Sequence, residues 1–70
     1  MGALNRLTLN GAAITVDAGT TVGSLIDGSA PDRRGIAVAV NDGVVPRSQW
    51  DHTHLSEGDR VEILTAAQGG

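Results

Sequence analysis

Hydrophobic and polar residues alternate with a period of two near the start of the chain. Leu7 and Leu9 are flanked by polar residues, and Ile14 and Val16 repeat the pattern a few positions later. Residues two apart share one face of a strand, so each run predicts a half-buried β-strand. Asn10-Gly11, between the two runs, is a strong hairpin signal because both central residues of a type I′ turn need positive φ. We therefore predict that the chain opens with a β-hairpin.

The apolar spacing then changes to that of a helix. One stripe at positions i, i+3 and i+4 is formed by Val22, Leu25 and Ile26. Thr20-Thr21 precede it and are suited to cap a helix, since a hydroxyl accepts a hydrogen bond from a free backbone N–H. Gly23 and Ser24 lower the intrinsic helix propensity, and we expect Gly28 and Pro31 to end the helix. Packing against a sheet, rather than local preference, must then stabilise it.

Further strands are predicted in the second half of the chain. Residues 36–40 are apolar on both faces, as is usual for a central strand. A turn at Asn41-Asp42-Gly43 leads to the short extended piece 44–46, whose proline cannot donate a ladder hydrogen bond and so predicts an edge strand. Trp50 is expected to fold back into the core, and residues 60–64 form the last strand.

This order of elements, with one helix crossing a small mixed sheet, is an α+β arrangement. It matches the β-grasp, or ubiquitin-like, fold, with four to five strands packed against a single helix. In that fold the first and last strands pair in parallel at the centre of the sheet. Residues 1–70 are expected to form one domain, with 65–70 as a flexible C-terminal tail.

Composition places the chain among small folded domains without covalent or metal staples. Its 70 residues bury only about 60% of the surface of the unfolded chain, so the core is thin. The absence of Cys excludes disulfides and thiolate metal sites, which secreted domains of this size usually need, so we expect a cytoplasmic location. No stretch has the roughly 20 apolar residues of a transmembrane helix, and the first residues lack the apolar core of a signal peptide. We expect no membrane association and no processing at the N-terminus.

The net charge of −3 argues against one class of partner. Nucleic-acid binding needs a basic face with stacking aromatics, and Trp50 is the only aromatic residue, so nucleic acid is not an expected partner. The mild acidity fits docking on a basic protein, but it is also common in soluble domains of no special function.

Side chains with catalytic or metal-binding chemistry do not form a recognisable site in the sequence. His52 and His54 lack a third ligand at a suitable spacing, so exposed loop histidines are the better interpretation. Ser48 and Ser56 would need a concave pocket to act with a His and an Asp, which a sheet this small rarely encloses. No glycine-rich phosphate loop is present. We expect neither an enzyme acting alone nor a cofactor or metal ion bound by this chain.

The chain ends in Gln68-Gly69-Gly70. On its own, such an end fits an incidental frayed terminus equally well. Its place a few residues after the last strand of a β-grasp domain favours a reactive C-terminus instead. Residues without Cβ pass through a narrow channel and adopt the backbone conformations that the channel imposes. The carboxylate of Gly70 is therefore suited to enter another enzyme's active site and to be activated there as an acyl-adenylate.

Two segments and the C-terminal glycines resemble the ThiS family of sulfur carriers in thiamine biosynthesis. Residues 38–50, with the sequence VAVNDGVVPRSQW, contain the Val-Pro-Arg and Trp pattern that is fairly specific to this branch. Residues 55–64, LSEGDRVEIL, and the Gly69-Gly70 end resemble the closing strand and tail, which ubiquitin-like carriers share more widely. The likeness covers essentially the whole chain.

The resemblance implies chemistry at the carboxylate of Gly70, with Gly69 and Gln68 as the neighbours that thread into partner enzymes. A ThiF-type, E1-like adenylyltransferase would adenylate Gly70 with its own ATP and Mg²⁺. A cysteine desulfurase system would supply the sulfur of a C-terminal thiocarboxylate. Thiazole synthase of the ThiG type would receive that sulfur for thiazole phosphate formation, so this chain would be a co-substrate and not an enzyme.

Positions on the folded body are candidate contacts for these partners. Arg47 is either a partner contact near the sheet edge or an exposed loop charge, and the sequence favours neither. Val44 and Leu64 are predicted to form an exposed apolar patch for the activating enzyme, although single exposed apolar residues are common.

Other functions fit the same fold. A molybdopterin-synthase small subunit, or another ubiquitin-like sulfur carrier, would use identical chemistry at Gly70, and the Val-Pro-Arg and Trp stretch and the short length favour thiamine. A ubiquitin-like protein modifier would be joined to lysines of a target protein. A plain β-grasp binding module would carry an incidental tail.

Overall fold

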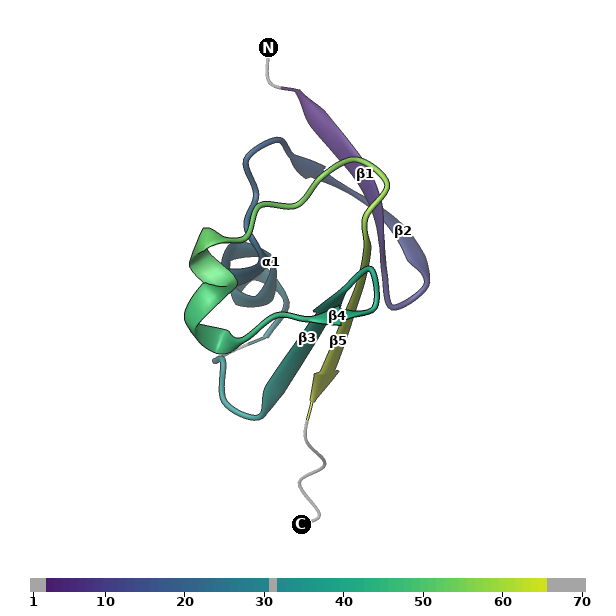
Figure 1. Ribbon diagram of the computed structural model, residues 1–70. Helices are drawn as coiled ribbons and strands as arrows, with labels where there is room; N and C mark the ends of the chain where they lie inside the picture. Colours follow the sequence, from purple (N-terminus) through teal and green to yellow (C-terminus); the bar gives the residue numbers. More distant parts are fainter. Residues whose placement is uncertain (1–2, 31, 66–70) are drawn as a thin grey trace.

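A computed structural model describes residues 3–30 and 32–65 of the chain. Over these residues the domain has two layers, a five-stranded sheet and a helical layer that covers one of its faces (Figure 1). In chain order the elements are β1 (Leu4–Leu9), β2 (Ala12–Asp17), α1 (Val22–Ser29), β3 (Ile36–Val40), β4 (Gly43–Val44), the 3₁₀ helix η1 (Arg47–His52) and β5 (Arg60–Thr65). This arrangement confirms the predicted α+β, β-grasp fold.

β5 lies at the centre of the sheet, whose strand order is β2-β1-β5-β3-β4. β1 pairs with β5 in parallel, with Leu9 opposite Val61, as predicted for the first and last strands. The other strand pairs are antiparallel. β4 lies at the edge, as predicted, but it ends at Val44. Pro46 is the N-cap residue of η1, because its φ of −60° and its missing N–H suit the start of a helix better than a strand.

Two tight turns contain the described non-glycine residues that have positive φ. Asn10 and Gly11 have φ of 50° and 84°, and Asn41 and Asp42 have φ of 51° and 72°. Positive φ at both central residues is the requirement of a type I′ turn, and Asn and Asp tolerate it better than most other residues. The hairpins β1–β2 and β3–β4 are therefore closed by the residues that predicted them.

Helix α1 begins with a capping box between Thr21 and Ser24. The Ser24 N–H donates to Thr21 Oγ1 over 3.2 Å, and the Thr21 N–H donates to Ser24 Oγ over 3.0 Å. Ser24, a weak residue by helix propensity, thus stabilises the helix start. The prediction that Gly28 ends the helix is wrong: the helix runs to Ser29, because Gly28 does not adopt the positive φ that would end it. Pro31 lies outside the described residues.

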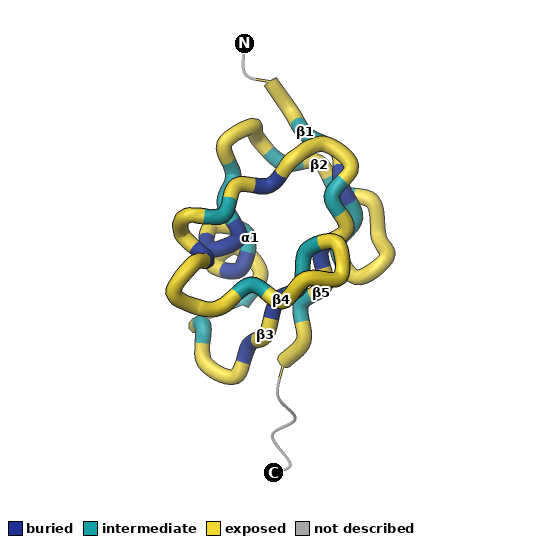
Figure 2. The backbone as a smooth tube through the Cα atoms, viewed as in Figure 1, coloured by how far each residue is buried: buried dark blue, intermediate teal, exposed yellow. Residues whose placement is uncertain are grey.

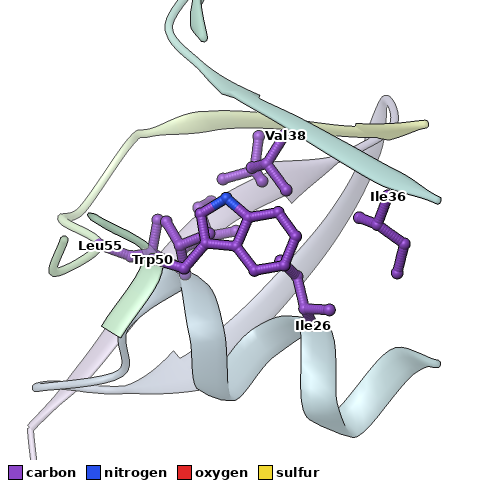
Figure 3. Packing of buried hydrophobic residues seen from close by; sticks show 8 residues of the cluster. Ile26, Ile36, Val38, Trp50 and Leu55 are labelled. Atoms are coloured by element: carbon purple, nitrogen blue, oxygen red, sulfur yellow. The ribbon is translucent and has the colours of Figure 1, made fainter. Parts of the chain in front are cut away.

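The core lies between the helical layer and the inner face of the sheet (Figure 2). Its buried hydrophobic members are Leu7, Val22, Ile26, Ile36, Val38, Trp50, Leu55 and Val61. Trp50 is only 1% exposed, and Figure 3 shows its ring among side chains of the sheet and of α1. Its Nε1–H donates to the Val45 carbonyl over 2.9 Å, so the buried polar atom is satisfied. The prediction that Trp50 folds back into the core is confirmed.

Candidate functional site

The predicted reactive end of the chain follows the central strand of the sheet. β5 continues to Thr65, which pairs with Ile36 of β3. Thr65, expected as the first residue of the tail, therefore belongs to the strand. The predicted reactive residues lie outside the described part of the chain: Gln68, Gly69 and Gly70. The structure shows that β5, the strand that precedes these residues in the chain, lies in the middle of the sheet rather than at an edge.

Val44 and Leu64 lie on the outer face of the sheet, on the side away from the helices. Both are exposed as predicted, at 78% and 69%. Leu64 lies opposite Ala37, and Val44 lies opposite Ala39. The small alanines leave a shallow depression of about 380 Å³ between the larger side chains. We call Ala37, Ala39, Val44 and Leu64 the outer apolar face, and the structure brings both predicted patch residues into it.

Arg47 lies in the helical layer, in η1. Its guanidinium carbon is 5.5 Å from the centre of the Trp50 ring, a favourable cation–π distance. Its Nη2 donates to the Arg33 carbonyl over 3.3 Å. Arg47 is exposed, but it is not part of the outer apolar face, and its described contacts lie within the domain. Its role as a partner contact stays a prediction.

Arg33 joins α1 to η1 through two carboxylates. Its Nε and Nη2 donate to the Asp27 carboxylate, each over 2.9 Å, and Nη2 also donates to Asp51 Oδ1 over 2.9 Å. These hydrogen bonds hold the pKa of both aspartates below the ordinary value, and they raise the pKa of Arg33 above its usual range. We call Asp27, Arg33 and Asp51 the charge clamp. The sequence alone does not reveal this clamp, because a contact across 18 residues leaves no local pattern.

Gly23 lies directly beneath the charge clamp. It is buried on the face of α1 that meets η1. A Cβ at this position would collide with Asp51 Oδ1 and would lie 2.8 Å from Arg33 Nη2. Gly23 weakens the helix by propensity, but its missing side chain gives the clamp room to form.

The other polar candidates of the sequence lie apart from one another. His52 ends η1, His54 forms an isolated bridge with Thr21, Ser48 lies within η1 and Ser56 opens the turn before β5. Within residues 3–30 and 32–65, no three His, Cys, Asp or Glu side chains are arranged to share a metal ion. The helices of this part of the chain are too short or too polar to cross a membrane.

Comparison with known proteins finds similarity that continues to the C-terminus of the chain. The family model described as "ThiS family" matches residues 3–70. The chain is 31% identical over 65 residues to the sulfur carrier protein ThiS of Escherichia coli strain K12, covering 93% of this chain and 98% of that protein. It is also similar to the crystal structure of the thiamine biosynthesis protein ThiS of Geobacter metallireducens. The TM-score is 0.74 and the identity 33%, over 93% of this chain and 99% of that one.

A further relative is a larger protein. A protein named thiazole synthase, from Paramagnetospirillum magneticum strain ATCC 700264 / AMB-1, is 32% identical over 65 residues. The match covers 93% of this chain but only 20% of that protein. A segment similar to this domain is thus part of a chain that is named for another activity.

Proposed function

The chain belongs to the ThiS family, the sulfur carriers of thiamine biosynthesis, and we propose that it carries sulfur as a thiocarboxylate on the C-terminal carboxylate of Gly70. The observation that carries this proposal is the family match, which spans the folded domain and extends through Gly70. The central position of β5 supports it, because a tail anchored in the middle of the sheet projects from a fixed point.

The chemistry follows from the poor reactivity of a carboxylate. A carboxylate oxygen of Gly70 attacks the α-phosphate of ATP in a partner enzyme, pyrophosphate leaves, and an acyl-adenylate forms. The persulfide sulfur of a cysteine desulfurase system then attacks the acyl carbon, and AMP leaves. A thiol cleaves the S–S bond of the resulting acyl disulfide, which releases the thiocarboxylate and leaves the two thiols joined as a disulfide. ATP and Mg²⁺ act in the ThiF-type, E1-like adenylyltransferase, so this chain needs no bound cofactor of its own. It serves as co-substrate and is not the catalyst of either step.

Thiazole synthase of the ThiG type is the proposed acceptor of the sulfur. The relative named thiazole synthase contains a segment similar to this domain, so a domain of this kind and the synthase occur in one chain. Segments that are joined in one protein and separate in another commonly work together, since joining raises their effective concentration. We place these steps in the cytoplasm, where thiol-based sulfur donors stay reduced.

The outer apolar face is the proposed docking surface for the activating enzyme. Gly70 lies six positions after Leu64, and an extended chain over six positions spans at most about 20 Å. An enzyme that holds Gly70 in its active site must therefore lie close to Leu64. Of the described surface at this end of the sheet, Leu64 and the nearby Val44 offer exposed apolar area that a partner can bury.

Intact-mass measurement tests the proposed chemistry. The protein is incubated with a ThiF-type enzyme, ATP, Mg²⁺, a thiol reductant and a cysteine desulfurase with its cysteine substrate. We expect a mass increase equal to the replacement of one oxygen by sulfur, and no such change in a variant that lacks Gly70. If the protein stays unmodified while a known ThiS carrier is converted in the same mixture, the proposal is wrong.

A further inference from the structure

Asn10 makes an unusual set of contacts with the strand that leads to the tail. The Ile63 N–H donates to Asn10 Oδ1 over 2.8 Å, and Asn10 Nδ2 donates to the Ile63 carbonyl over 3.2 Å. The Asn10 backbone N–H also donates to the Val61 carbonyl over 2.9 Å. One turn residue therefore bonds to β5 at two successive inward-facing positions.

These contacts replace a strand partner that β1 cannot supply. The parallel pairing of β1 with β5 ends where Leu9 lies opposite Val61, because β1 then enters its hairpin turn. β5 continues to Thr65, beside that turn (Figure 1). On this side of β5, the carboxamide of Asn10 occupies the place of the next peptide group and satisfies both backbone groups of Ile63. The second half of β5 is thus held on both sides, by Asn10 and by β3.

We propose that Asn10 is a positioning residue for sulfur transfer, which acts through Ile63 to fix the point and direction in which the chain leaves the sheet. The inference rests on the proposed function, since it matters only if Gly70 is the reactive end. Without the Asn10 carboxamide, the end of β5 is held by β3 alone, and the anchor of the tail becomes less ordered. A partner enzyme must then order that strand end when it binds the carrier, which weakens binding without changing the chemistry of bound Gly70.

Asn41 provides a matched control at the other end of the same strand. It has φ of 51°, close to the 50° of Asn10. Its Oδ1 accepts from the Arg60 N–H over 2.9 Å, and its own N–H donates to the Arg60 carbonyl over 2.8 Å. The residue type and the backbone conformation are the same, and each side-chain oxygen accepts a backbone N–H of β5. The Nδ2 of Asn41 differs, because it donates to Asp59 Oδ1 over 3.0 Å and not to a strand carbonyl. Arg60 is the first residue of β5, and Ile63 lies near the last.

The test compares Asn10→Gly with Asn41→Gly. Glycine keeps the positive φ without strain, so each variant removes only the side-chain contacts. For adenylation by a ThiF-type enzyme, measured as pyrophosphate release, we expect Asn10→Gly to raise KM about fivefold with kcat unchanged. Asn41→Gly is expected to leave both constants near wild type. Amide hydrogen exchange gives a readout that is independent of activity: it should quicken at Ile63 in the first variant and at Arg60 in the second.

Equal effects of the two glycine variants on KM would overturn the proposal and assign Asn10 a purely structural role. An unchanged KM in Asn10→Gly, with faster exchange at Ile63, would overturn it as well. Asn10 also lines the depression of the outer apolar face, so a raised KM with unchanged exchange at Ile63 would assign Asn10 a direct contact with the enzyme and overturn the proposal. If Asn10→Gly does not fold, Asn10→Asp carries the test, because it retains the acceptor for the Ile63 N–H and tolerates positive φ. Its KM is expected to lie between wild type and the glycine variant. Failure of the wild-type chain to be adenylated would refute the proposed function instead, and the hydrogen-exchange result would stand apart from it.

Discussion

Arg33 shows how a single side chain organises the helical layer of this domain. Its guanidinium bonds to Asp27 and Asp51 and lies 5.8 Å from the centre of the Trp50 ring. The side chain is 30% exposed, and the two carboxylates are 58% and 64% exposed, so water and salt screen their attraction. Its contribution is therefore geometric more than energetic. A planar fork with several donors fixes the orientation of η1 against α1, which a lysine would not do.

The charge clamp predicts an acid-dependent loss of stability. The folded-state pKa of Asp27 and of Asp51 lies below the ordinary 3.8, so the stability that the clamp contributes is fully present above that value. It is lost as the pH falls through the depressed folded-state pKa values. Arg33→Gln is expected to lower Tm modestly and by a constant amount between about pH 7 and about pH 5. The difference from wild type should shrink and vanish at lower pH, as followed by thermal melts monitored with circular dichroism.

Arg34→Gln is the control for this measurement. Arg34 carries the same charge, but its side chain is 88% exposed, and among the described residues its ion pair is with its near neighbour Asp32, at 3.5 Å. Removing it changes the net charge equally without breaking the clamp. If the two variants show the same Tm at every pH, net charge explains the effect and the clamp does not.

At the scale of the element, α1 contains two glycines with opposite surroundings. A Cβ at Gly28 would meet nothing within 4 Å, whereas one at Gly23 would displace the carboxylate of Asp51. Gly28→Ala is expected to stabilise the protein by about 0.5–1 kcal/mol, the usual gain in helix propensity. Gly23→Ala should stabilise the protein less than Gly28→Ala, because its Cβ displaces the Asp51 carboxylate and the loss of the clamp offsets the same gain. Urea denaturation of both variants measures the difference.

A double variant tells whether the clamp is the reason. In the Arg33→Gln background the Asp51 side chain is free to rotate away, so Gly23→Ala should be more favourable there than in the wild type. An equal effect of Gly23→Ala on the free energy of unfolding in both backgrounds would mean that the clamp does not explain the difference between the two glycines.

The elements also show which parts of the fold can be predicted from local sequence. The strands and both hairpin turns were predictable, because period-two alternation and Asn-Gly or Asn-Asp pairs act over a few residues. The capping box was missed because Ser24, not the usual Glu or Gln, is the partner of Thr21. The charge clamp and the bonds of Asn10 to Ile63 join residues 18 and 53 positions apart, and only the topology of the sheet brings them together. The exposure of Leu64 and Val44 was predicted, but their shared depression depends on the strand order, which local sequence does not give.

At the scale of the whole molecule, the two faces of the sheet differ in whether helices cover them. The inner face is closed by α1 and η1, which the charge clamp and the buried Trp50 hold together. The outer face has no covering element among the described residues (Figure 1). The outer apolar face lies on it, beside the second half of β5. Under the proposed function, a partner bound to this face lies beside the end of β5, so the proposed recognition and the proposed chemistry belong to the same end of the domain.

This arrangement gives a last prediction, which tests whether the position of an exposed leucine on the sheet, and not only its hydrophobicity, affects adenylation. Leu64 and Leu4 are both exposed apolar residues on the outer face, at 69% and 60%. β1 and β5 are parallel, so Leu4, at the start of β1, lies at the opposite end of the sheet from the end of β5. Leu64→Asn is expected to raise the KM for adenylation about tenfold, the loss of one moderate interface contact, whereas Leu4→Asn should leave it unchanged. Both variants preserve the net charge, and both residues are exposed, so Tm should change little. Equal effects at the two leucines would show that the activating enzyme responds to exposed apolar area in general, and no effect at either would place its docking surface on another face.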